Sequence, residues 1–200
     1  MGETTLARGL VLLLAGVALA CDGRSPTSAL DDATCGPWPS QASSPYVLPY
    51  PAGEAYTVLQ GNCTPGTHAA GTRDGHAYDV SMPIGTSVIA ARGGVVGEVE
   101  ERFADGNGVV SEANYVLIQH EDGTAAVYFH LTRNGVLVNL GGSVRQGDPI
   151  ALSGQTGRAG ISPHLHFGVL GRGGATIPVT FKNTEPHPDG LQRGLTYLAF

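Results

Sequence analysis

Two of the chain's seven histidines stand one residue apart in the segment ISPHLHFGVL, residues 161–170. Residues two apart on a β-strand face the same side, roughly 6.6 Å from each other. His164 and His166 would therefore share one face, while Leu165 and Phe167 would point into the core. One imidazole can bind a metal while the other reaches a water molecule on it. The pattern suggests a metal site, although a polar strand face can also carry two histidines with no such role.

A third histidine, His130, stands next to the end of the segment AVYFHL, residues 126–131. If the strand alternation continues to its end, His130 shares a face with Tyr128, and Phe129 points the other way. A single histidine at a strand end is also compatible with a purely structural role.

A third cluster of metal-binding residue types lies in THAAGTRDGHAYDV, residues 67–80, which contains His68, His76 and Asp79. Asp79 can be read as a turn cap or as a carboxylate ligand. Catalytic zinc sites combine His nitrogens and carboxylate oxygens, and they leave one position open for water. This cluster can supply the carboxylate ligand and the further histidine ligand that the pair His164 and His166 does not provide.

Taken in chain order, these motifs resemble the lysostaphin-type (LytM-like) zinc metallopeptidases, most of which are peptidoglycan endopeptidases. The resemblance covers about residues 60 to 170. Its motifs are a His…Asp pair ending at Asp79, Tyr-x-His-Leu at 128–131, Gly-x-Thr-Gly at 154–157 and Pro-His-Leu-His-Phe at 163–167.

The resemblance implies a role for each matching residue. Asp79 and His166 correspond to zinc ligands. His164 corresponds to the histidine beside the metal-bound water, and this histidine would act as the base. His130 would assist His164 or stabilise the oxyanion of the intermediate.

The first zinc ligand is where this chain departs from the commonest family pattern, because Gly75 occupies the position four residues before Asp79. Family members with a similar Asp-x-x-x-Pro-x-Gly-Thr stretch use a longer gap, which selects His68. His76 is the alternative, but residues 76 and 79 of a strand face opposite sides, so His76 would need a bend. We expect the metal ligands to be His68, Asp79 and His166.

The elements that must position these residues are short strands joined by tight turns, since the chain has 30 Gly, 13 Pro and only 14% charged residues. Alternation predicts strands at 95–100, 115–120, 124–130, 149–153, 164–169, 177–181 and 195–200. The Asp122-Gly123 pair predicts a hairpin between the second and third of these strands. We expect an all-β fold: a single compact antiparallel β-sheet domain with long Gly-rich loops, at 106–108 and 154–162, around a groove. His120 and His187 read as exposed loop residues.

The N-terminal apolar run, residues 9–20, would be about 18 Å long as a helix, too short for a hydrocarbon core of roughly 30 Å. We therefore expect a signal peptide over residues 1–20. Ala18-Leu19-Ala20-Cys21 resembles a lipobox, which would make Cys21 a lipid anchor in the membrane; ordinary cleavage near Ala20 is the alternative. Residues 21–45 read as the lipidated cysteine and a flexible tether, and residues 46–200 as the metallopeptidase domain.

The chain has three cysteines, an odd number for an exported protein. If Cys21 carries lipid, Cys35 and Cys63 remain, and an oxidising compartment favours a disulfide between them. Two free thiols are the alternative.

The resemblance thus implies a Zn²⁺-dependent endopeptidase that hydrolyses peptide bonds in peptidoglycan stem peptides or cross-bridges. We expect it to be an exported lipoprotein of the cell envelope, in the periplasm or on the outer surface, and a monomer. The net charge of −6 and the lack of a basic cluster argue against nucleic acid as a partner. The alternatives are a non-catalytic peptidoglycan-binding or amidase-activating lipoprotein of the same fold, and an exported sugar- or cofactor-binding β-domain.

Overall fold

The computed structural model describes Met1 and residues 35–200. The expected signal peptide, Cys21 and most of the expected tether lie outside these residues. Within the described part, no helix is long and apolar enough to cross a membrane. The helical structure described is one 3-10 turn, η1 (Gln41–Ser43).

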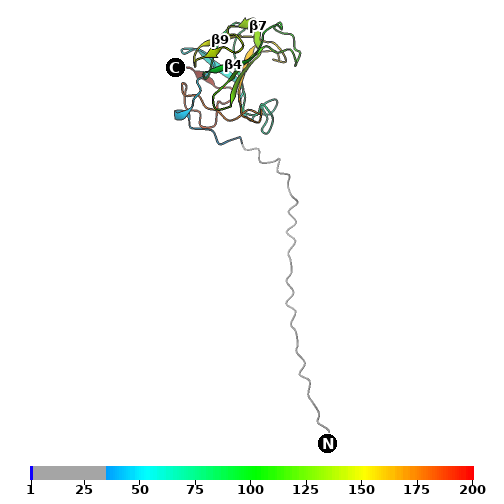
Figure 1. Cartoon of the computed structure of the whole chain (residues 1–200), viewed down its shortest axis with the longest axis vertical. Coiled ribbons are helices and arrows are strands. Elements are labelled where there is room, and N and C mark those ends of the chain that lie inside the picture. The colour runs from blue at the N-terminus through cyan, green and yellow to red at the C-terminus, as the bar shows by residue number, and fades with distance from the viewer. Residues whose placement is uncertain (2–34) are drawn as a thin grey trace. The chain divides into compact units, whose positions relative to one another are not determined.

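The described residues form an all-β fold of two antiparallel sheets, which confirms the predicted fold class (Figure 1). In chain order the strands are β1 (Ala55–Gln60), β2 (Tyr78–Ser81), β3 (Ser87–Ile89), β4 (Gly94–Glu100), β5 (Tyr115–Gln119), β6 (Ala125–Phe129), β7 (Leu131–Val136), β8 (Ser143–Val144), β9 (Pro149–Ser153), β10 (His164–Leu170) and β11 (Thr196–Leu198).

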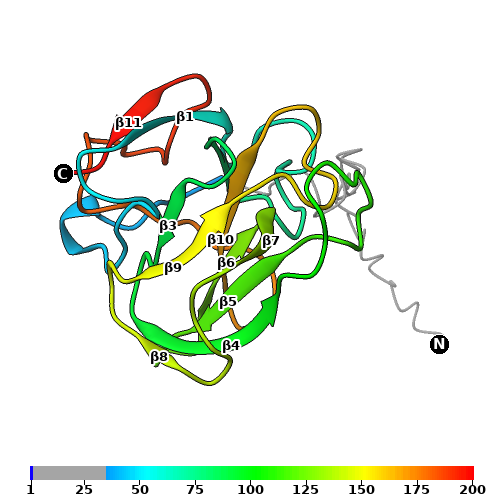
Figure 2. The ribbon, with the colours of Figure 1, turned by 90° about the horizontal axis from the view of Figure 1, so that it is seen from above.

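The larger sheet has the strand order β11-β1-β2-β10-β6-β5-β4-β8, and the smaller one β3-β9-β7 (Figure 2). The two sheets share one hydrophobic core, in which Val88 and Ile150 of the smaller sheet join Tyr128 and Phe167 of the larger one. Tyr128 and Phe167 are partners in the β6–β10 register, with ring centroids 5.3 Å apart. This core fixes β10 at the centre of the large sheet, between β2 and β6.

The alternation predicted for the His-Leu-His segment is confirmed in β10. Leu165, Phe167 and Val169 are fully buried in the core, so the side chains of His164 and His166 emerge on the other face. The β5–β6 hairpin also forms as predicted, and Gly123 at its turn has a φ of 83°, a left-handed conformation that favours glycine.

The expected strand at 177–181 is wrong. Only Thr176 forms an isolated bridge, to Leu170. Pro178 has no N–H to donate to a ladder, and the N–H of Phe181 donates instead to the Nε2 atom of His187, 2.9 Å away. The alternating apolar residues are therefore buried by an irregular segment packed on the core.

Residues 35–44, which fall in the expected tether, contact the domain. A disulfide joins Cys35 to Cys63. The Gln41 side chain donates to the carbonyl of Thr184 at 2.8 Å, and Ser44 is buried. The disulfide thus links this segment to the loop that follows β1.

Candidate metal centre

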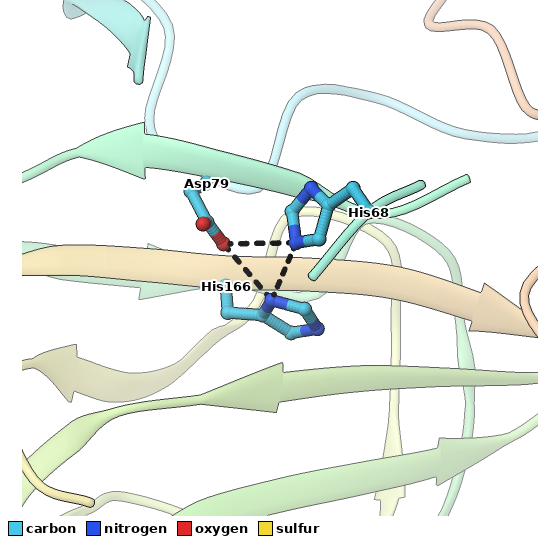
Figure 3. Close-up of side chains that lie close together, drawn as sticks. All are labelled: His68, Asp79 and His166. Atoms are coloured by element: carbon cyan, nitrogen blue, oxygen red, sulfur yellow. Dashed lines mark hydrogen bonds and ion pairs between the residues drawn. The ribbon is translucent and has the colours of Figure 1, made fainter. Parts of the chain in front are cut away.

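Three side chains from distant parts of the chain meet on the face of the large sheet that carries the β10 histidines (Figure 3). The Nδ1 atom of His166 lies 2.9 Å from Oδ1 of Asp79 and 3.2 Å from Nε2 of His68. The same His68 nitrogen lies 3.4 Å from the Asp79 oxygen. One donor atom from each residue therefore points to a common centre.

Strand register brings two of these residues together. β2 and β10 are antiparallel neighbours, and Asp79 is paired with His166, so both side chains leave the same face of the sheet at the same level. The pairing depends on residues 87 positions apart in sequence.

His68 comes from the loop between β1 and β2, which a series of turns folds over the strands. Backbone N–H groups of Ala69, Thr72 and Gly75 each donate to the carbonyl three residues earlier. At Gly75 an added Cβ would lie 3.0 Å from the Ala69 carbonyl oxygen, so the turns leave little room for a side chain there. The loop instead presents His68, which is fully buried.

The three donor atoms fit a zinc ion in chemistry and spacing. Two imidazole nitrogens and a carboxylate oxygen are typical zinc ligands. Bonds of about 2.0–2.1 Å in a tetrahedron place the ligand atoms roughly 3.4 Å from one another. The separations here, 2.9, 3.2 and 3.4 Å, are close to that value.

The ionisation of these groups suits metal binding. Burial alone would raise the pKa of Asp79, but the hydrogen bond from His166 and the three nearby imidazoles outweigh it and lower the pKa below the ordinary value. Burial lowers the pKa of His68, against the opposing effect of Asp79. A carboxylate and a neutral imidazole result, and these are the forms that bind metals.

Two further histidines lie next to this cluster. The Nε2 atom of His164 is 3.7 Å from Oδ1 of Asp79. The rings of His130 and His164 have centroids 4.7 Å apart. The structure therefore brings together all five residues that the sequence nominated for the site.

The expected facing of His130 is wrong. Its φ of 65° interrupts the alternation at the end of β6, so His130 does not follow Tyr128 into the core. Both Phe129 and His130 instead line a cleft beside the cluster. A positive φ costs energy in a non-glycine residue, and here the Nδ1 atom of His130 donates to the Thr156 carbonyl at 2.7 Å.

The hydrogen bonds of His164 and His130 determine which ring nitrogen of each is left without a hydrogen-bond partner among the described residues. The Nδ1 atom of His164 donates to the Ser162 carbonyl at 2.9 Å, and that of His130 donates to Thr156. In neutral imidazoles the Nε2 atoms then carry lone pairs. Burial, followed by the neighbouring His164, lowers the pKa of His130 to about 4. Sequence reasoning did not foresee the Ser162 and Thr156 carbonyls, because backbone acceptors leave no pattern in the residue types.

The cluster opens into a cleft with a volume of about 510 Å³. The loop predicted at 154–162 lines it through Arg158, Ala159 and Gly160. The loop after β4 contributes Val110 and Ala113, instead of the glycines at 106–108 that we expected. A cleft of this size accommodates an extended peptide segment.

The remaining histidines lie apart from the cluster. The Nδ1 atom of His76 faces the Thr176 carbonyl at 3.1 Å, and its ring packs edge-on against Trp38. His120 and His187 were expected to be exposed, but both are buried, at 6% and 3% exposure. Each forms a hydrogen bond through Nδ1 to a backbone carbonyl, of Gly93 and Glu185 respectively.

The sequence model of peptidase family M23 matches residues 73–178, more than half of the chain. This chain belongs to peptidase family M23. The matched segment includes Asp79, His130, His164 and His166 and begins after His68. The family assignment confirms the resemblance to lysostaphin-type peptidases.

Individual relatives agree with this assignment. Over 95 residues, 48% of the chain, it is 40% identical to the peptidoglycan DD-endopeptidase ShyA of Vibrio cholerae, but the match spans 20% of that protein. It is 34% identical to the uncharacterized lipoprotein YgeR of Escherichia coli, over 55% of this chain and 41% of the relative. The solved structure of pseudoalterin, an M23 metalloprotease from the deep sea, matches with a TM-score of 0.50 at 18% identity, over 72% of this chain and 82% of that one. The last likeness supports the fold.

Proposed function

We propose that this chain is a zinc-dependent endopeptidase that hydrolyses peptide bonds in peptidoglycan stem peptides or cross-bridges. The observation that carries the proposal is the meeting of His68, Asp79 and His166 in one donor set that fits zinc. Membership of the M23 family and the identity to a peptidoglycan DD-endopeptidase point to the substrate.

In this proposal His68 Nε2, Asp79 Oδ1 and His166 Nδ1 hold the metal. Bound zinc would supply Lewis acidity, polarising the substrate carbonyl and acidifying a water molecule. The remaining chemistry falls to the two neighbouring imidazoles.

His164 would act as the general base. The Ser162 carbonyl holds its Nδ1 proton, so the Nε2 lone pair faces the Asp79 side of the cluster and can accept a proton from the attacking water. His130, held in the same tautomer by the Thr156 carbonyl, would assist by accepting a proton at Nε2, and the protonated Nε2 would then hydrogen-bond to the developing oxyanion. The cleft would hold an extended peptide across these groups.

Digestion of purified peptidoglycan tests the proposal. The full-length chain should release muropeptides, a chelator should stop the release, and added zinc should restore it. Mass spectrometry of the fragments identifies the severed bond. A chain that binds cell walls without releasing fragments would instead be the non-catalytic lipoprotein considered above.

We also propose export and anchoring through lipid on Cys21, which lies outside the described residues. The oxidised Cys35–Cys63 pair and the relative named as a lipoprotein support this placement. Labelling of cells with a clickable fatty acid should mark the chain, and Cys21→Ala should remove the label. A label that survives this substitution would contradict the anchor.

A further inference from the structure

One segment that lines the cleft beside the cluster, residues 158–160, contributes a positively charged side chain. Arg158 lines the cleft together with Ala159, Gly160, Val110 and Ala113. None of these neighbours is acidic. The guanidinium of Arg158 is exposed and has no hydrogen-bond or ion-pair partner among the described residues. A free positive charge therefore lies in the cleft that contains the candidate catalytic groups.

Hydrogen bonds on the N-terminal side of Arg158 hold its loop in place. The N–H of Gly157 donates to the Asn107 side chain at 2.9 Å, and that of Asn114 donates to the Thr156 hydroxyl at 2.8 Å. The Thr156 carbonyl accepts the hydrogen bond from His130. Arg158 thus follows by two residues the backbone group that orients His130.

A second charged segment, residues 73 and 74, lines the same cleft and differs from the Arg158 segment in its charge. Arg73 and Asp74 lie next to each other there, before β2, and the Arg73 side chain donates to the Gly174 carbonyl at 3.2 Å. This pair has a charge of each sign, so it gives no net preference. The other lining carboxylate, Asp79, is engaged by His166 and His68 in the cluster, so Arg158 is a lining cation without an acidic partner of its own among the described residues.

A guanidinium presents a planar fork of donors that matches a carboxylate in two parallel hydrogen bonds. Bridges made of glycine have no side-chain carboxylate to offer, whereas stem peptides linked through a diamino acid can carry a carboxylate beside the link. We propose that Arg158 is a specificity-determining residue that binds a substrate carboxylate next to the scissile bond. The chain then prefers carboxylate-bearing stem peptides to glycine bridges. This inference rests on the proposed function and names its substrate class.

A pair of synthetic peptides tests the inference. The two differ only in a free carboxylate or a carboxamide beside the scissile bond. The unmodified chain should have at least about tenfold higher kcat/KM for the carboxylate peptide. Arg158→Gln should reduce this ratio to near one and Arg158→Lys should restore part of it, because a lysine keeps the charge without the fork. Arg133→Gln, at an exposed arginine of β7 outside the cleft, is the matched control and should leave the ratio unchanged.

Equal hydrolysis of both peptides by the unmodified chain would overturn the inference and leave the proposed function standing. An equal ratio change in Arg158→Gln and Arg133→Gln would also overturn it. Binding to the His164→Ala chain, measured by calorimetry, gives a second readout that does not need turnover. Preferential binding of the carboxylate peptide, abolished by Arg158→Gln, would support the inference. If neither peptide is cut, that failure would count against the proposed function and not against the inference. Equal binding of both peptides would overturn the inference.

Discussion

The Nε2 atom of His68 lies 3.2 Å from the Nδ1 atom of His166, although 98 residues separate the two histidines in the chain. The turns of the β1–β2 loop bring His68 to this position, and they hold His76, eight residues later, against Thr176. The fold therefore places His68 beside His166 and keeps His76 away from it, whereas the spacing in the sequence only favoured His68 over His76.

His68→Ala and His76→Ala form a matched pair for testing that distinction. His68→Ala should lower zinc affinity by at least about tenfold and abolish peptidoglycan hydrolysis, since one of three ligands is lost. His76→Ala should retain zinc. Metal content after dialysis, measured by mass spectrometry, gives the answer; zinc loss in His76→Ala but not in His68→Ala would show that the ligand assignment is wrong.

His164→Ala should leave zinc bound and reduce turnover by roughly 10²–10⁴-fold, because the substitution removes the base and keeps all three ligands. Parallel assays of metal content and hydrolysis separate the two effects. Substantial hydrolysis by His164→Ala would refute its role as base. Circular dichroism of the variant checks that the fold is intact.

Stability should fall as the pH is lowered below about 6.5, because His120 and His187, like His68 and His130 at the metal centre, are buried as neutral groups. Burial lowers the pKa of each below its ordinary value. The unfolded chain, with an ordinary pKa of about 6.5, then binds more protons than the folded chain in this range, and protonation favours unfolding. Urea denaturation at about pH 7.5 and pH 5, with a chelator present to exclude metal effects, measures the difference.

His187→Gln provides the control for this pH dependence. The glutamine side chain can still accept a hydrogen bond from the Phe181 N–H but does not titrate, so the substitution should weaken the dependence of stability on pH. Equal urea midpoints for the unmodified chain at both pH values would contradict the account.

Replacement of both Cys35 and Cys63 by Ser should lower the free energy of unfolding by about 2–4 kcal/mol, because the disulfide closes a loop between residues 28 positions apart. Trp38, the chain's one tryptophan, packs against His76 and reports on this segment by its fluorescence. Reduction of the unmodified chain should produce the same loss. An unchanged urea midpoint in the double variant would mean that the bond contributes little.

Sequence reasoning succeeded where periodicity is local. Alternation in β10 predicted which of its side chains reach the core, and the Asp122-Gly123 pair predicted the hairpin between β5 and β6. Neither prediction needs knowledge of residues far away in the chain.

Sequence reasoning failed where a single backbone angle or a distant hydrogen-bond partner determines the direction of a side chain or the conformation of a segment. The φ of 65° at His130 turns that side chain into the cleft, and alternation alone placed it with Tyr128. The segment at 177–181 alternates like a strand, but Pro178 and the bond from Phe181 to His187 remove it from the ladder. His120 and His187 occur in polar or Pro-rich sequence, and only tertiary packing buries them.

The central claim is that two imidazole nitrogens and one carboxylate oxygen bind a single zinc ion. X-ray absorption at the zinc edge of the full-length, zinc-loaded chain tests it most directly. We predict two imidazoles and oxygen donors at about 2.0–2.1 Å, with one imidazole lost in His166→Ala. A sulfur ligand, a spectrum unchanged by His166→Ala, or failure of the chain to retain zinc would contradict the account.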